Sequence, residues 1–259
     1  MEHEGFQSRN GLSTMHHALY LALLTASLLG FRHGFDYDHI AAITDVVSVQ
    51  QSKRAAMRLG MIYAFGHAVT VALLGSIVVL FGINLPAGVD RWAERLVGLT
   101  LLLLGIYVLS TLVLKPGYLP KSRYALIHQG YNWIRLAVNR RRAASPPQRS
   151  ATPQSFDARS VFVIGVVHGL GAETPSQLLI FLLAANLGGA ALGMLGLGMF
   201  LAGLLTMNAL MTASVAGLFG VSRHRPRVLR AVSALTAIYS LITGIIFLAG
   251  RSSLLPALN

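Results

Sequence analysis

Long apolar stretches separated by short polar connections follow one another along this chain. Six of them have the length of about 20 residues or more that an α-helix needs to cross the hydrocarbon core of a bilayer. They cover residues 18–48, 59–82, 94–114, 160–185, 189–220 and 228–250. The first and the fifth are too long for one helix along the membrane normal, so we expect each to be tilted, broken or extended. The pattern predicts an all-α polytopic membrane protein with six transmembrane helices, some of them broken.

Composition supports this prediction. Charged residues make up 12% of the 259 residues, whereas soluble domains carry about 25%. Hydrophobic residues make up 54%, and the mean hydropathy is +0.61. There is no cysteine, which excludes disulfides and thiolate metal ligands.

Basic residues predict how the chain sits in the membrane. Of the 21 Lys and Arg residues, 16 lie in three connections, near residues 50–58, 115–159 and 221–230, which six spans place on one side. By the positive-inside rule this side is cytoplasmic, so both termini are extracytoplasmic in the cell (plasma or inner) membrane. The net charge of +12 therefore reflects topology, and we expect no nucleic-acid partner.

The two halves of the chain resemble each other. His33-Gly34 recurs 135 residues later as His168-Gly169, and "VVLFG" at 78–82 is echoed by "AGLFG" at 216–220. Because three spans is an odd number, a second copy enters the membrane from the opposite face. This predicts a 3+3 inverted repeat with its substrate site at the midplane, an architecture typical of secondary transporters.

The predicted domains follow from the repeat. A basic cytoplasmic linker separates the two three-helix repeats, and a short segment flanks them at each end. In chain order they cover residues 1–17 (extracytoplasmic segment), 18–114 (first repeat), 115–158 (linker), 159–250 (second repeat) and 251–259 (tail).

Ionisable side chains gather in the first span, in "FRHGFDYDHIAAITD". Each costs at least about 2.5–3.5 kcal/mol at the centre of a membrane, so a functional role is expected. On an ideal helix His33, Asp36 and His39 fall within an arc of about 120°, which offers two imidazoles and a carboxylate to one ion. Imidazole and carboxylate without thiolate suit Ni²⁺, Co²⁺, Zn²⁺ or Fe²⁺.

The predicted metal pathway draws on both halves of the chain. Its residues are His33, Asp36, Asp38, His39, His67, His168 and Glu173. For His67 and His168 the alternative is a hydrogen bond between helices. Three weaker candidates have alternatives as well: chance for the amino-terminal His3, an ion pair with Arg32 for Asp45, and an interhelical hydrogen bond for Asn208.

Three motifs resemble the nickel–cobalt transporter family. They are His33-x4-Asp38-His39, "YAFGHAVTV" around His67, and "HGLGAETPSQ" with Glu173. The family requires its His-x4-Asp-His element for metal uptake, so the resemblance implies a permease. Tyr37 and Gly171 depart from the usual motifs, and the family's leading extra span is missing, which is similar to a short, urease-accessory-type branch.

We therefore expect a secondary transporter that moves a divalent metal cation, Ni²⁺ or Co²⁺, into the cytoplasm. It would be no enzyme and hold no resident cofactor, with the cation and the lipid bilayer as partners. No Walker A motif occurs, so ATP would act through a partner. Two alternatives stay open, an intramembrane zinc-dependent hydrolase and a metal or small-ion exporter of a related 3+3 fold. The sequence also leaves open a homo-oligomer.

Overall fold

The fold consists of helices throughout the part of the chain that the structure, a computed structural model, describes: residues 2–50, 52–82, 87–114, 156–171, 175–222 and 225–255. In four helices only the backbone of some residues is described, namely 2–16, 18, 87, 89–90, 113–114, 175–188 and 226. The α-helices are α1 (Glu2–His33), α2 (Tyr37–Ser48), α3 (Lys53–Phe81), α4 (Ala87–Leu114), α6 (Ala158–Gly171), α7 (Pro175–Ser222) and α8 (Pro226–Leu248). A 3₁₀ turn, η1 (Ser252–Leu254), follows.

Four described helical segments are long and apolar enough to cross a membrane. They are Lys53–Phe81, Arg91–Leu112, Gly189–Ser222 and Arg227–Leu248. These segments correspond to the predicted second, third, fifth and sixth spans. The predicted first and fourth spans contain shorter apolar helices, Leu19–His33 and Ala158–Gly171. The prediction of a helical, multi-pass membrane protein is confirmed at this level.

The predicted first span is a broken helix. Helix α1 ends at His33, and α2 begins at Tyr37 after Asp36, whose backbone is extended (φ −69°, ψ 161°). The amides of Phe35 and Asp36 bond to the carbonyls of Arg32 and His33, which closes a tight turn. The predicted boundary after residue 17 falls inside the continuous helix α1.

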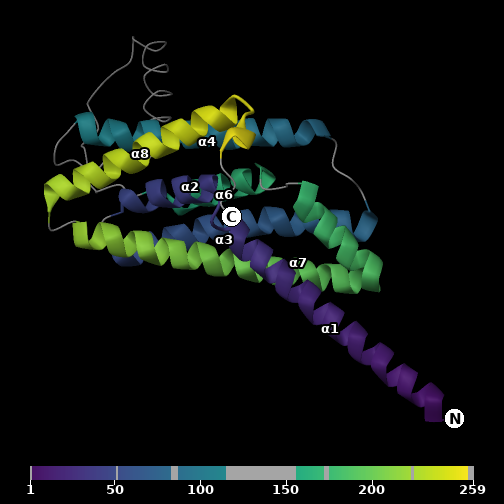
Figure 1. The fold of residues 1–259 in the computed structure, drawn as a ribbon. Helices are drawn as coiled ribbons and strands as arrows, with labels where there is room; N and C mark the ends of the chain where they lie inside the picture. The colour runs from purple at the N-terminus through teal and green to yellow at the C-terminus, as the bar shows by residue number, and fades with distance from the viewer. Residues whose placement is uncertain are drawn as a thin grey trace, which may run out of the picture.

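The predicted range 160–185 is likewise not one helix, because α6 ends at Gly171 and α7 begins at Pro175. Proline suits the first turn of a helix, where its missing N–H costs nothing. The predicted start of the next span at residue 189 coincides with a change inside α7. Gly189 has φ +75°, which a right-handed helix does not allow, and α7 bends sharply in Figure 1.

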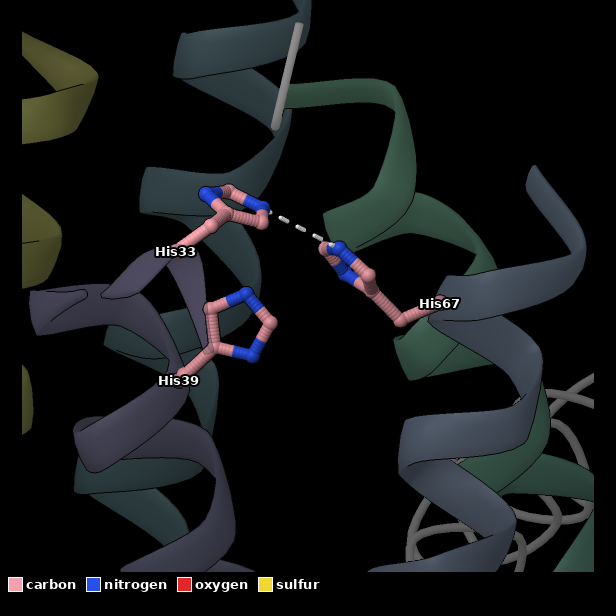
Figure 2. A group of neighbouring side chains, drawn as sticks. All are labelled: His33, His39 and His67. Carbon is pink, nitrogen blue, oxygen red and sulfur yellow. Dashed lines mark hydrogen bonds between the residues drawn. The ribbon is translucent and has the colours of Figure 1, made fainter. Parts of the chain in front are cut away.

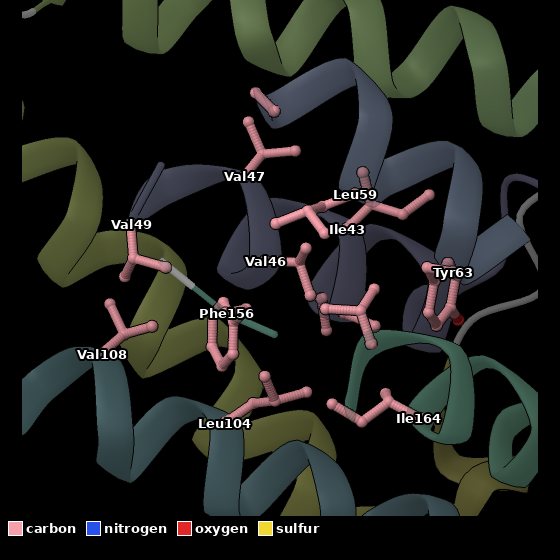
Figure 3. Packing of buried hydrophobic residues seen from close by; sticks show 14 of the residues in the cluster. Ile43, Val46, Val47, Val49, Leu59, Tyr63, Leu104, Val108, Phe156 and Ile164 are labelled. Atoms are coloured by element: carbon pink, nitrogen blue, oxygen red, sulfur yellow. The ribbon is translucent and has the colours of Figure 1, made fainter. Parts of the chain in front are cut away.

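Helix α2 lies at the centre of the bundle. Figure 1 shows α2 and α6 between a layer formed by α4 and α8 and a layer formed by α3 and α7. The main pairs of packed helices are α1 with α7, α3 with α6, α3 with α7, and α4 with α8. In Figure 3, Val46 of α2 packs among Leu104, Phe156 and Ile164, all of them buried. A short helix is thus held rigidly by its neighbours.

Close helix contacts depend on glycine at two related positions. A methyl group at Gly30 of α1 would strike the carbonyl of Phe200 on α7. A methyl group at Gly165 of α6 would strike the carbonyl of Tyr63 on α3. The backbones therefore approach more closely than any larger residue allows, as small residues commonly permit between membrane helices.

Described helix ends that flank the basic connections lie close to one another. The Lys53 side chain at the start of α3 lies against Gly220 near the end of α7. Gly98 of α4 lies against Gly244 of α8, and Gly105 lies against Ala237, so the two helices run antiparallel. The end of α4 therefore meets the start of α8, as the left of Figure 1 shows. This arrangement agrees with the distribution of charge read from the sequence.

Candidate metal site

Three buried histidines converge at the break between α1 and α2. His33, His39 and His67 each offer a ring nitrogen, and these nitrogens all lie within 4.8 Å of one another. The ring centroids are 5.0 Å apart for His33 and His39, 5.4 Å for His33 and His67, and 4.4 Å for His39 and His67. Figure 2 shows the three rings turned toward a common space.

The local fold explains this convergence. His33 is the last residue of α1, and His39 lies in the first turn of α2, so the turn between them brings their side chains together. His67 has 14 residues of α3 on either side of it. At 1.5 Å per residue it lies about 21 Å from each end of that helix. The group therefore lies halfway along the bundle, where sites of repeat-built transporters occur.

Asp36 contacts His33 and does not belong to the group of three histidines. Its Oδ2 lies 2.8 Å from His33 Nδ1, and its side chain is 40% exposed while that of His33 is 4% exposed. A carboxylate that accepts from one ring nitrogen fixes the tautomer and leaves the other nitrogen as a donor to metal. The expectation that His33, Asp36 and His39 share one helix face is wrong, because the helix breaks between them.

Several buried polar atoms around the histidines have no hydrogen-bond partner among the described residues. They are both ring nitrogens of His39, Nδ1 of His67, and both amide atoms of Asn208. All three residues are fully buried. A buried polar group without a partner costs about 1–3 kcal/mol, so such groups are rare in folded proteins. Their concentration at one place indicates a site that receives a ligand.

The spacing suits a cation. Nε2 of His33 and Nε2 of His67 lie 3.4 Å apart, long for a hydrogen bond. Two imidazole nitrogens at about 2.0–2.1 Å from one tetrahedral ion lie about 3.3–3.4 Å apart. All the ligand nitrogens of the group lie within 4.8 Å of one another, so they would move closer together to share one ion. The three histidines therefore fit a divalent transition metal.

Asp38 lies on another side of α2. It is 6% exposed and interacts electrostatically with His168, Asp36 and His33. A carboxylate at this position would offset part of the charge of a dication held by the histidines. Asp38 thus lies next to the three-histidine group without being one of its members.

His168 is held by two hydrogen bonds from the first half of the chain. Its Nδ1 lies 2.9 Å from the Tyr63 hydroxyl, and its Nε2 lies 2.7 Å from Thr100 Oγ1. Both ring nitrogens are therefore engaged in this arrangement. The sequence analysis did not single out Tyr63 or Thr100. Tyr63 lies one helical turn before His67, a spacing that places both on one helix face.

Of the remaining predicted residues, one lies next to the three histidines, one lies farther along α2, and two lie outside the described residues. Asp45 is fully buried on α2, two turns beyond Asp38. Asn208 of α7 approaches the His39 ring without the geometry of a hydrogen bond. Glu173 lies outside the described residues, and so does the side chain of His3. Phe200 of α7, which was not predicted, stacks on His33 with centroids 5.8 Å apart.

Comparison with known proteins points to metal transport. Residues 19–115 match the NicO family, described as high-affinity nickel-transport protein. The chain is 25% identical over 196 residues to the nickel transporter NixA of Staphylococcus aureus, covering 70% of this chain and 56% of the relative. It is 33% identical over 86 residues to the cobalt transport protein NhlF of Rhodococcus rhodochrous, covering 33% of this chain and 24% of the relative.

The chain thus spans about half the length of the first of these relatives and a quarter of the second. No solved structure matches it. The matched segment, residues 19–115, contains His33, His39 and His67. The resemblance inferred from the motifs is confirmed over this segment, because residues 19–115 are similar to the NicO family, described as high-affinity nickel-transport protein.

Proposed function

We propose that this protein is a secondary permease that moves Ni²⁺ or Co²⁺ across the cell membrane into the cytoplasm. The observation that carries the proposal is the group of His33, His39 and His67, which is buried halfway along the bundle. Three of its ring nitrogens have no hydrogen-bond partner among the described residues. Three imidazoles suit borderline divalent metals. The transported ion is the substrate, and the protein itself carries out no chemical conversion.

We further propose that the fold is a 3+3 inverted repeat. Contacts related by a constant shift along the chain support it. The contact of Gly30 with Phe200 corresponds to that of Gly165 with Tyr63, at shifts of 135 for the α1 and α6 partners and 137 for the α7 and α3 partners.

A second pair of contacts has the same shifts. Ser27 lies against Gly203, and Phe162 lies against Gly66. The α1–α7 pair thus corresponds to the α6–α3 pair, as a pseudo-two-fold axis requires. His168 corresponds to His33 at the shift of 135, and we propose Glu173, which follows His168 in the chain, as an element of the pathway.

The proposed orientation places the basic end of the bundle in the cytoplasm and both termini outside. Inward movement of a dication is then favoured by about 4.6 kcal/mol at a membrane potential of 100 mV, because each charge contributes about 2.3 kcal/mol. No further coupling is required to concentrate the metal. The linker 115–158 would connect the two repeats on the cytoplasmic side.

The site explains how an ion could bind and leave. Asp36 presents Nε2 of His33 to the ion, while His39 and His67 complete a set of three nitrogens from α1, α2 and α3. Asp38 lies beside them and contributes negative charge. The site forms where the first repeat meets α7 of the second, so relative movement of the repeats would expose the ion to one side and then to the other.

Uptake of radioactive nickel by cells tests this proposal, with cobalt and zinc as competitors. His33→Ala, His39→Ala and His67→Ala should each abolish uptake, whereas His17→Ala, a matched change at an exposed histidine of α1, should leave it intact. Undiminished uptake in the three site variants would refute the proposed site. Metal retained by the purified protein together with water-dependent cleavage of lipid or peptide would instead favour a zinc hydrolase, since three histidines also hold catalytic zinc.

A further inference from the structure

We propose that the side-chain amide of Asn208 is the fourth donor to the transported ion and the ligand that the second half of the protein supplies. This inference rests on the proposed function and deepens it, because it states how ion binding in the first half is linked to the position of the second. His33, His39 and His67 all belong to the first half.

The side-chain amide of Asn208 is buried without a hydrogen-bond partner among the described residues. Asn208 is fully buried, and neither its amide oxygen nor its amide nitrogen has a hydrogen-bond partner among the described residues. Its backbone carbonyl accepts a bond from the Thr212 hydroxyl, and the helix continues through it, so the side chain is not needed to repair the backbone. An amide of this kind in an apolar helix is costly unless it binds something.

Asn208 lies next to the group of three histidines. The Asn208 amide approaches His39, whose two ring nitrogens also lack partners. Met207, which precedes Asn208 in α7, packs against Gly34 in the turn between α1 and α2. Asn208 therefore faces the three histidines from the opposite repeat, at the level where the first helix is broken.

The two proposed repeats differ at the position of Asn208. With the shift of 137 that relates α3 to α7, Asn208 corresponds to Val71, and His67 corresponds to Leu204. Both Val71 and Leu204 are buried apolar residues. Packing at this position is thus satisfied by valine in one repeat, so the amide in the other has a different role.

Three imidazoles and one amide oxygen form a four-donor set without charge. Such a set suits Ni²⁺ and Co²⁺, and a dication leaves it more readily than a set of carboxylates. Because Asn208 lies on α7, its bond to the ion would join the two halves while the ion is bound. Loss of that bond would release both the ion and the contact between the halves.

The test uses the intact chain purified in detergent, with Ni²⁺ and Co²⁺ binding measured by calorimetry and the visible absorption of bound Co²⁺ as the report on its ligands. Asn208→Leu should weaken binding about tenfold or more and change the Co²⁺ spectrum. Thr206→Ala, at an exposed polar residue of the same helix, should change neither. Asn208→Asp should bind the metal more tightly than Asn208→Leu does, because aspartate keeps an oxygen donor while it removes the N–H groups.

The outcomes separate the possibilities. If Asn208→Leu binds and reports Co²⁺ like the intact protein while His39→Ala does not bind, this inference is overturned and the proposed function stands. If Asn208→Asp fails like Asn208→Leu although both variants fold, the amide N–H groups serve His39, and the donor role is wrong. If the intact chain binds neither metal, the proposed function falls, and this inference falls with it.

Discussion

Removal of the Asp36 carboxylate should weaken metal binding without unfolding the protein. The carboxylate lies 2.8 Å from Nδ1 of His33 and holds the other ring nitrogen toward His67. Its side chain is 40% exposed, so Asp36→Ala leaves no buried cavity. Partners that orient a metal-bound histidine typically contribute 10–100-fold to metal affinity.

The exposure of Asp36 sets the expected size of the effect. Because the Asp36 side chain is partly exposed and thus less firmly held than a buried partner, we expect the lower end of that range, about tenfold, which is about 1.4 kcal/mol of binding free energy. Asp36→Asn should have a smaller effect, since its amide oxygen still accepts from the ring but carries no charge. Calorimetric titration of the purified variants with Ni²⁺ measures the affinity, and the concentration for half-maximal uptake should rise in parallel.

The matched control is Asp157→Asn, at an exposed aspartate just before α6 that keeps its ability to cap the helix. It should bind Ni²⁺ like the intact protein. If Asp36→Ala also binds Ni²⁺ with unchanged affinity, then His33 is not a ligand whose orientation matters, and the reasoning about the site is refuted.

Three further predictions concern packing, the His168 contacts and pH. Gly30→Ala should sharply lower the thermal stability of the purified protein, because the added methyl group strikes the Phe200 carbonyl. The control Gly198→Ala has open space around the added methyl group and should lower it much less. Equal melting temperatures for the two variants would contradict the packing argument. Tyr63→Phe and Thr100→Val each remove one hydrogen-bond partner of His168, so Ni²⁺ transport should slow while the affinity for Ni²⁺ changes little. A tenfold loss of affinity in either variant would instead make His168 part of the binding site. Protons compete with metal for imidazole nitrogen, so uptake should fall as the external medium becomes strongly acidic, and an uptake profile that stays flat down to the pH at which the protein unfolds would count against histidine ligation.

Much of the helical architecture could be predicted from the sequence, because membrane insertion depends on local hydrophobicity over about 20 residues. The two broken helices were harder. Gly34 follows the last residue of α1, and α7 begins at Pro175, yet neither residue alone decides where a helix stops within an apolar run. What ends α1 at His33 is a turn closed by backbone hydrogen bonds at Phe35 and Asp36, which no hydropathy window detects.

The histidine group could be predicted in part for a similar reason. Spacing in the sequence indicated that His33 and His39 act together, and a motif pointed to His67. The role of Asp36 could not be predicted, because an ideal helix places it beside both histidines, whereas the break turns it toward solvent. The bonds of Tyr63 and Thr100 to His168 depend on how α3, α4 and α6 pack, which only the tertiary structure reveals.

The most direct test of the account is X-ray absorption spectroscopy of the purified protein loaded with Ni²⁺, which counts the imidazole ligands. The account predicts three imidazoles in the intact protein and two in His67→Ala, with the remaining position filled by oxygen. A spectrum dominated by oxygen donors, or one that is identical in His67→Ala, would contradict the claim that the metal binds among the three histidines at the centre of the bundle.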